Sequence, residues 1–210
     1  MPRLLVATTN PDKLREIRGL LAGVKIDLLS LADLPPVKEP EETGATFEEN
    51  ARIKALFYDS YARHAWLEAG QPPALTVAED SGLVIDALGG DPGVYSARFV
   101  RPDASYAERF AEIYRRLENA RAPRPWTARF VCALSTVWNG RPVFETRDIV
   151  EGTIAEGPAG VGGFGYDPVF FFEQFGKTLA EVDDDRRLQV AHRGHAFRAL
   201  GRWLLEPHPY

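Results

Sequence analysis

The pattern of hydrophobic and polar residues along the chain predicts strands and helices in alternation. Residues 3–9 (RLLVATT) form a short apolar run typical of a buried strand, and Asn10-Pro11 follows as a helix N-cap and first helical residue. A helix lying on the sheet should come next, because apolar residues recur there at helical spacing. These residues are Leu14, Ile17, Leu20 and Leu21. A second, weaker strand is expected at residues 25–29.

An irregular loop and a long helix should follow. Residues 31–44 (LADLPPVKEPEETG) contain too many breakers for regular structure. Thr46 and Glu49 then match the T-x-x-E capping box, which predicts a helix from there to about residue 69.

Residues 74–88 (ALTVAEDSGLVIDAL) predict a strand, a polar turn at residues 79–82 and a second short strand. On this prediction, Glu79 and Asp80 stand at a strand end. Active-site groups of open α/β sheets gather at such positions.

The second half of the chain adds a helix at residues 104–119 and an antiparallel hairpin around Asn139-Gly140. A glycine-rich run then precedes the aromatic strand VFFF, and an amphipathic helix ends near Leu205. Together these elements predict an α/β fold with a twisted mixed sheet flanked by helices.

Composition narrows the function classes. The chain has 210 residues, of which 45% are hydrophobic and 26% charged, so we expect a single globular domain over residues 1–210. The formal net charge of -5 argues against nucleic acid as a partner. No apolar run has the length of a signal-peptide core or a membrane span, so we expect a cytoplasmic protein without a membrane partner. The single cysteine, Cys132, lies in an apolar run and is expected in the core.

The segment from Thr8 to Lys13 is the first candidate site. A strand opens here into a helix whose first backbone N–H groups can receive a phosphate, and Lys13 adds a positive charge. The segment contains no glycine, so it is neither a Walker A loop nor a dinucleotide-binding fingerprint. A plain capped turn is the alternative interpretation.

Carboxylates form the second candidate. Glu42 and Asp80 offer hard oxygen ligands that suit Mg²⁺, with Mn²⁺ as a substitute, and Glu79 is a further candidate ligand. In a hydrolysis reaction, a second carboxylate nearby could activate the water molecule that attacks the substrate. Solvated surface charge is the alternative.

Two later segments complete the candidates. In GGFGYDP, a purine could stack on Phe164, although Phe164 and Tyr166 could instead be core residues. In the last part of the chain, cations at Arg186, Arg187 and Arg193 accompany His192 and suggest an anion or base contact, with a solvated helix face as the alternative.

Five segments taken in order resemble the inosine triphosphate pyrophosphatase family, whose bacterial members remove dITP and XTP. They span almost the whole chain, and their order and spacing make the resemblance specific. The segments are ATTNPDKLREIRGLL, EETGATFEENARIKA, AEDSGLVIDALGGDPGVYSARF, GGFGYDPVFF and AHRGHAFRAL.

The resemblance implies hydrolysis of dITP, ITP and XTP to the monophosphate and pyrophosphate, by a homodimeric enzyme whose two lobes enclose a cleft. It implies that Glu42 and Asp80 hold Mg²⁺, with Asp80 also the proton acceptor. Residues of the nucleotide site would be Thr8, Thr9, Asn10, Pro11, Asp12, Lys13, Lys54, Ser81, Phe164, Gly165, Tyr166, Asp167, Arg187, His192 and Arg193.

Several positions depart from the pattern of the family. Thr9 and Asp12 replace glycines that are common in the first loop, and Glu79 replaces an aspartate common in bacterial members. Arg187 stands where lysine is usual, and Ala191 replaces the serine of the S-H-R motif. These departures bear on substrate ranking more than on the reaction.

Selectivity requires a site that accepts a 6-oxo purine and rejects adenine. We expect Arg193 to donate a hydrogen bond to O6 of the purine. The 6-amino group of adenine would instead face the guanidinium donor to donor and leave buried polar groups unpaired. Three other classes are alternatives: a Maf-like pyrophosphatase acting on pyrimidine or modified nucleotides, a regulatory nucleotide-binding module, and a nucleic-acid-binding protein.

Overall fold

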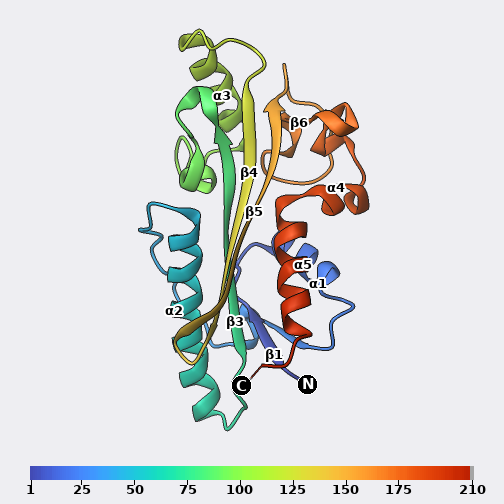
Figure 1. Ribbon diagram of the computed structural model, residues 1–210. Helices are drawn as coiled ribbons and strands as arrows, with labels where there is room; N and C mark the ends of the chain where they lie inside the picture. Colours follow the sequence, from blue (N-terminus) through green and yellow to red (C-terminus); the bar gives the residue numbers. More distant parts are fainter. Residues whose placement is uncertain (209–210) are drawn as a thin grey trace. The chain divides into compact units, whose positions relative to one another are not determined.

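A seven-stranded mixed sheet organises the computed structural model, which describes residues 1–208 (Figure 1). Within these residues the strand order is β2-β1-β3-β4-β5-β6-β7. β1 is parallel to β2 and β3, whereas β6 is antiparallel to β5 and β7. The strands are β1 Arg3–Val6, β2 Asp27–Ser30, β3 Leu75–Ile85, β4 Thr127–Trp138, β5 Arg141–Ile154, β6 Phe170–Phe172 and β7 Lys177–Thr178. The predicted α/β class with a mixed sheet is confirmed.

The helices begin where the sequence supplies caps. Asn10 caps the first helix and Thr46 the second, as predicted. The helices are α1 Pro11–Leu20, α2 Phe47–Glu68, α3 Tyr106–Asn119, α4 Asp184–Val190 and α5 His192–Leu204. Short 3₁₀ turns lie at Leu31–Asp33, Asp86–Leu88, Gly93–Arg98, Asp167–Val169, Glu173–Phe175 and Leu179–Glu181. In residues 1–208 we find no helix with the length and apolar character that a membrane crossing needs.

The predicted turn at residues 79–82 is wrong. β3 continues through these residues as one strand from Leu75 to Ile85, and most of its side chains are buried. Pairing in the sheet overrides the local preference of a polar Ser-Gly sequence for a turn. The strand that ends near these residues is the neighbouring strand β1, whose last residue, Val6, lies opposite Val77 of β3. Glu79 and Asp80 therefore extend past the end of a neighbouring strand.

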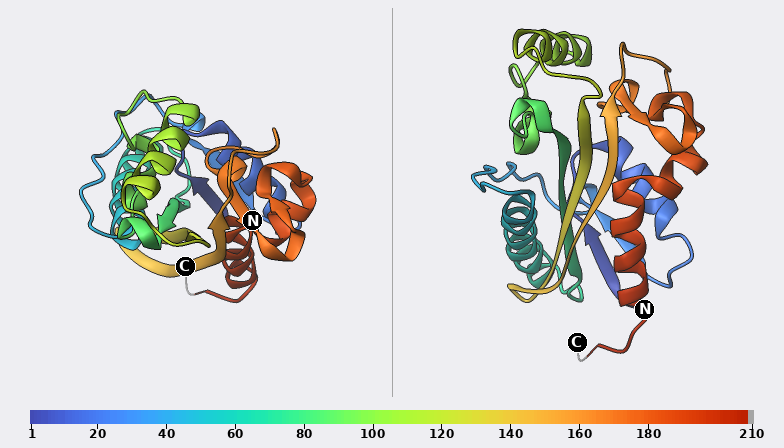
Figure 2. Two further views of the ribbon diagram at one scale, coloured as in Figure 1. Left: turned by 90° about the horizontal axis from the view of Figure 1, so that it is seen from above. Right: turned by 45° about the horizontal axis from the view of Figure 1, so that its top comes forward.

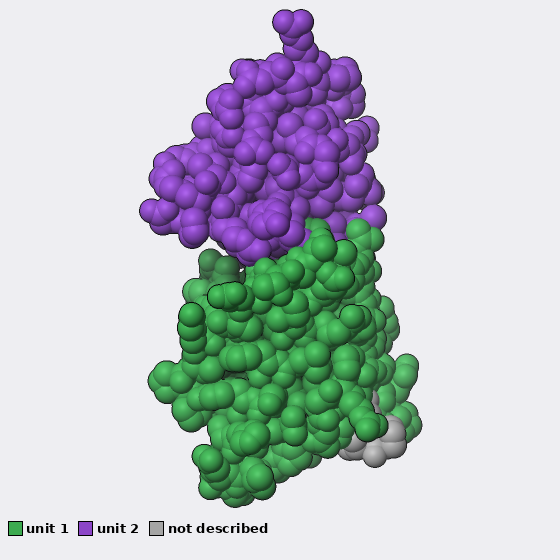
Figure 3. All heavy atoms as spheres, turned by 90° about the vertical axis from the view of Figure 1, so that its left-hand side faces the viewer, with its two compact units in different colours: residues 1–80, 132–148, 193–210 green, residues 81–131, 149–192 purple. Residues whose placement is uncertain are grey.

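The chain divides into two compact units (Figure 3). Unit 1 contains residues 1–80, 132–148 and 193–210, of which 209–210 lie outside the described part. Unit 2 contains residues 81–131 and 149–192. β3, β4 and β5 contribute residues to both units.

Unit 1 has three layers, with α2 on one face of the sheet and α1 and α5 on the other (Figures 1 and 2). On the α1/α5 face, Val77 of β3 packs with Ile17 and Phe197. On the α2 face, Ala78 packs with Ala55 and other small and aromatic residues. Consecutive residues of β3 thus serve opposite layers, because side chains alternate along a strand.

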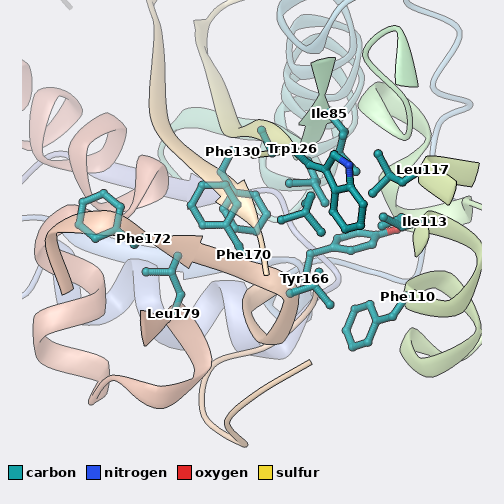
Figure 4. Packing of buried hydrophobic residues seen from close by; sticks show 14 of the residues in the cluster. Ile85, Phe110, Ile113, Leu117, Trp126, Phe130, Tyr166, Phe170, Phe172 and Leu179 are labelled. Atoms are coloured by element: carbon teal, nitrogen blue, oxygen red, sulfur yellow. The ribbon is translucent and has the colours of Figure 1, made fainter. Parts of the chain in front are cut away.

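Unit 2 encloses a core rich in aromatic side chains (Figure 4). Phe130 and Phe170 lie with their ring centroids 4.4 Å apart. Tyr166 is buried here, and its hydroxyl donates to the backbone oxygen of Ser96 at 2.8 Å. Of the two interpretations offered by the sequence, the core one holds for the Tyr166 side chain.

Candidate active site

Neighbouring carboxylates in β3 belong to different clusters of charged residues. Asp80 shares its face of the sheet with Ala78 and contacts side chains of α2. Glu79 shares its face with Val77 and contacts side chains of α1 and α5. The two carboxylates therefore act in separate environments, although the sequence places them side by side.

The Asp80 cluster consists of Glu42, Asn50, Lys54 and Asp80. The Lys54 ammonium lies 2.6 Å from Oε1 of Glu42 and 3.0 Å from Oδ1 of Asp80. Two carboxylates from distant parts of the chain thus point at one positive charge. α2 supplies Lys54 two turns after its N-terminus, and the loop before α2 supplies Glu42.

Burial and charge set the proton affinities in this cluster. Burial, reinforced by the negative charge of Glu42, raises the pKa of Asp80 above its ordinary value of 3.8, against the opposing effect of Lys54. Burial would lower the pKa of Lys54, but attraction to Asp80 and Glu42 outweighs it and raises that pKa. Lys54 therefore carries its charge at neutral pH, and Asp80 binds a proton more readily than an exposed aspartate.

The Glu79 cluster consists of Lys13, Glu16, Glu79, Cys132 and Arg193. Arg193 donates to both oxygens of Glu79, with Nε 2.9 Å from Oε2 and Nη2 3.0 Å from Oε1, and its Nη1 donates to Glu16 at 2.9 Å. The Lys13 ammonium lies 2.8 Å from Oε1 of Glu79. Arg193 is 4% exposed, so this network is held inside the protein.

Burial and charge in this network shift the pKa values of Glu79 and Cys132 in opposite directions. Burial would raise the pKa of Glu79, but Arg193 and Lys13 outweigh it and hold that pKa well below 4.5. Burial also raises the pKa of the Cys132 thiol well above its usual range, and its Sγ lies 3.4 Å from Oε2 of Glu79. Cys132 is thus a protonated core residue, as the apolar run around it predicted.

The N-terminus of α1 is capped by its own chain. Oδ1 of Asn10 accepts the backbone N–H groups of Asp12 at 2.9 Å and Lys13 at 3.2 Å. The N–H of Asn10 donates to Oγ1 of Thr8. The sequence predicted these N–H groups as phosphate donors, whereas the structure gives them intramolecular acceptors. The Asp12 and Lys13 N–H groups could bind a phosphate only by leaving the cap, whereas side chains of this segment, such as those of Thr8 and Lys13, could contact one directly.

In unit 2, Asp167 holds the glycine-rich turn. Its Oδ2 accepts the backbone N–H of Phe164 at 3.0 Å and lies 3.4 Å from Nη1 of Arg187. Gly163 has a φ of +65°, and a Cβ there would lie 2.1 Å from the same oxygen, so the turn requires glycine. The Arg187 guanidinium lies 6.0 Å from the centre of the Phe164 ring.

The remaining predicted residues divide between exposed and buried places. Thr9 and Pro11 are exposed, while Ser81 and Gly165 are half-buried. His192 is buried and stacks on Phe130 with ring centroids 4.9 Å apart.

Two members of the clusters were not predicted, Glu16 and Asn50. Glu16 lies beside Ile17 within the amphipathic pattern of α1, and Asn50 lies one residue after Glu49 of the capping box. A buried polar residue next to the apolar stripe of a helix is the signal that could have revealed both. Arg193 lies 177 positions from Glu16 and Asp80 lies 30 positions from Asn50, and local patterns do not show contacts at such separations.

The candidate metal ligands of the Asp80 cluster are a pair of carboxylates rather than a group of three or more ligating side chains. In the described residues no three His, Cys, Asp or Glu side chains gather in an arrangement that could hold a metal ion. Two carboxylates suffice for Mg²⁺, which keeps several waters and binds phosphate oxygens. Glu42 and Asp80 form such a pair.

Comparison with known proteins places the chain in a family. A "dITP/XTP pyrophosphatase" of an Exiguobacterium species is 43% identical over 198 residues, which cover 94% of each chain. A protein of the same name from Geobacillus kaustophilus is 41% identical and covers 95% of this chain and 93% of its own. The solved structure of a HAM1 protein from Coxiella burnetii matches with a TM-score of 0.83 and 35% identity, covering 99% of this chain and 100% of its own. The model of the Ham1 family matches residues 4–203, and the chain belongs to that family.

Proposed function

We propose that this protein hydrolyses the non-standard purine nucleotides dITP, ITP and XTP to the monophosphate and pyrophosphate. The names of its relatives support this activity. The observation that carries the proposal is the convergence of Glu42 and Asp80 on the Lys54 ammonium. Carboxylates and a lysine at this spacing suit a substrate that is a metal-bound polyphosphate.

The donors of the Asp80 cluster fit a divalent cation. Both carboxylates already contact one positive charge, the Lys54 ammonium, so their oxygens lie close enough together to bind a common cation. They are hard oxygen ligands, which favours Mg²⁺ and its substitute Mn²⁺. When bound, the ion would neutralise phosphate oxygens and polarise the phosphorus. The Glu79 carboxylate is less suited, because Lys13 and Arg193 enclose it.

In the proposed reaction, a water molecule attacks the α-phosphorus of the nucleotide. The bond from the water oxygen to Pα forms, the bond from Pα to the α–β bridging oxygen breaks, and pyrophosphate leaves with that oxygen. Asp80 accepts the proton of the water, the role that the family resemblance implies for it. Lys13 and Lys54 offset the charge that grows on the departing pyrophosphate.

The other site residues stay predictions of the family resemblance. They include the contacts of Thr8, Thr9 and Asn10 with phosphate and the stacking of Phe164 on the base. The homodimer, the cytoplasmic location and the single domain with a cleft between two lobes also stay predictions.

The test is pyrophosphate release from a panel of triphosphates with and without Mg²⁺. We expect turnover of dITP, ITP and XTP, little turnover of ATP, and none in excess chelator. Preference for dTTP or UTP would favour the Maf-like alternative. Release of orthophosphate alone would identify a different reaction.

A further inference from the structure

The buried side chain of Asn50 joins the two segments that carry the proposed metal ligands. Asn50 lies in the first turns of α2 and is 0% exposed. Its Nδ2 donates to Oδ2 of Asp80 at 3.3 Å, and its Oδ1 accepts the backbone N–H of Gly44 at 2.8 Å. One amide therefore holds Asp80 at one end and the loop that carries Glu42 at the other.

The loop lies against α2 more closely than a side chain would allow. A Cβ on Gly44 would lie 2.7 Å from Oδ1 of Asn50 and 2.9 Å from its backbone nitrogen. Gly44 follows Glu42 by two residues, so the position of its backbone limits where the Glu42 carboxylate can reach. The absence of a side chain at Gly44 is thus what permits the hydrogen bond to Asn50.

An amide suits this position better than a charged group would. The two oxygens of Asp80 are divided between Lys54, which binds Oδ1, and Asn50, which binds Oδ2. Asn50 orients the carboxylate without adding a charge that would compete with a bound cation. Groups that orient a metal ligand in this way typically alter metal affinity or activity by about 10- to 100-fold when they are removed.

We propose that Asn50 is a positioning residue that sets the orientation and separation of Glu42 and Asp80 for one divalent cation. This inference rests on the proposed function, because it assigns the metal to these two carboxylates. Because Asn50 is 0% exposed, we expect it to act through its two partners rather than by contacting the nucleotide.

The first test is Asn50→Leu, which keeps the approximate size of the side chain and removes both hydrogen bonds. We expect the Mg²⁺ concentration for half-maximal pyrophosphate release from dITP to rise by roughly tenfold or more. At saturating Mg²⁺, kcat should fall while KM for dITP changes little. Gly44→Ala should shift the Mg²⁺ requirement in the same direction with Asn50 intact, because its Cβ pushes the loop away.

Two further measurements do not depend on catalysis. In the metal-free protein, hydrogen exchange at the Gly44 amide should be roughly tenfold faster in Asn50→Leu, because its acceptor is lost. Mn²⁺ binding, followed by electron paramagnetic resonance without nucleotide, should weaken in both variants. If the wild-type protein releases no pyrophosphate, the proposed function fails, while these two measurements still decide the role of Asn50.

Asp59→Asn is the matched control. Asp59 is also a buried polar residue of α2, but it accepts the backbone N–H of Gly140 and the Nε of Arg63 instead. The Asp59→Asn substitution should lower the thermal stability of the protein without changing its binding of Mg²⁺ or Mn²⁺. Wild-type metal binding in both Asn50→Leu and Gly44→Ala, or an equal shift in Asp59→Asn, would overturn the proposal. If Asn50→Leu does not fold, Gly44→Ala decides it.

Discussion

Glu79 and Asp80 are neighbours in one strand, yet their surroundings drive their proton affinities in opposite directions. Arg193 and Lys13 both bind Glu79 and hold its pKa well below 4.5. Asp80 has Lys54 as its hydrogen-bonded positive partner and shares it with Glu42, and the further attraction of Lys13 is weaker, so burial prevails and its pKa is raised. Strand alternation and the cations on each face therefore separate a carboxylate that keeps its charge to well below pH 4.5 from one that binds a proton more readily.

The largest expected effect is on the Asp80 side. Asp80→Asn keeps the shape of the side chain but removes the proposed base and metal ligand. We expect pyrophosphate release from dITP to fall by about a thousandfold, within the range usual for loss of a general base. The measurement is kcat/KM at saturating Mg²⁺, with Asp59→Asn as a control for a buried acid outside the cluster. Activity within tenfold of the wild type would remove Asp80 from the chemistry.

Glu79→Gln tests the other side of the comparison, and its main effect should be on stability. The change leaves the buried Arg193 and the half-buried Lys13 without their shared carboxylate. Breaking a buried ion pair costs about 3–5 kcal/mol, so we expect a loss of that order in the free energy of unfolding, measured in urea by tryptophan fluorescence. The control is Glu145→Gln, which breaks an exposed pair with Arg52 and should cost less than about 1 kcal/mol. Equal losses in both variants would contradict a special role for the Glu79 cluster.

The stability difference between the wild type and Glu79→Gln should depend on pH. Glu79 has a lower pKa in the folded protein than the ordinary 4.5 expected in the unfolded chain. Its contribution is therefore fully present above pH 4.5 and is lost as the pH falls towards the folded pKa, because the unfolded chain takes up the proton first. Urea unfolding of both proteins from neutral pH down to acid should show the curves converging. A difference that stays constant below pH 4.5 would contradict the depressed pKa.

The sequence predicted much of unit 1, and its failures have a common cause. Helix starts at Asn10 and Thr46 depend on contacts within four residues, which the sequence displays directly. The turn expected at residues 79–82 is wrong because pairing within the sheet, a long-range effect, decides the conformation of β3.

Long-range contacts also explain why only part of the candidate site could be predicted from the sequence. Asp80, Glu42 and Lys54 were predicted together through the family resemblance, and the structure brings them within contact. Glu16 could not be paired with Arg193, because 177 positions separate them and the motif that contains Arg193 does not identify Glu16 as its partner. Partners that meet only after folding are invisible to patterns of spacing.

A smaller effect is expected on the selectivity between ITP and ATP, and its measurement would define the role of Arg193. The sequence predicts a contact with O6 of the base, whereas the structure shows its guanidinium bonded to Glu79 and Glu16. If the O6 contact forms, Arg193→Ala should lower kcat/KM for ITP more than for ATP, by roughly 5- to 150-fold for a difference of about 1–3 kcal/mol. The ratio between the two substrates is the measurement, because loss of folded protein affects both equally. Equal losses would restrict Arg193 to holding Glu79.

The smallest effect concerns the cap of α1, which begins beside the Glu79 cluster. Asn10→Ala removes the acceptor of the Asp12 and Lys13 N–H groups and should lower the free energy of unfolding by about 1 kcal/mol. Asn10→Asp keeps a cap oxygen, so stability should be retained, but its charge would repel a triphosphate bound nearby and raise KM for dITP. Urea unfolding and steady-state kinetics of the two variants therefore separate capping from phosphate binding. If Asn10→Asp leaves KM unchanged, the triphosphate does not lie at the N-terminus of α1, and the cationic role of Lys13 is confined to Glu79.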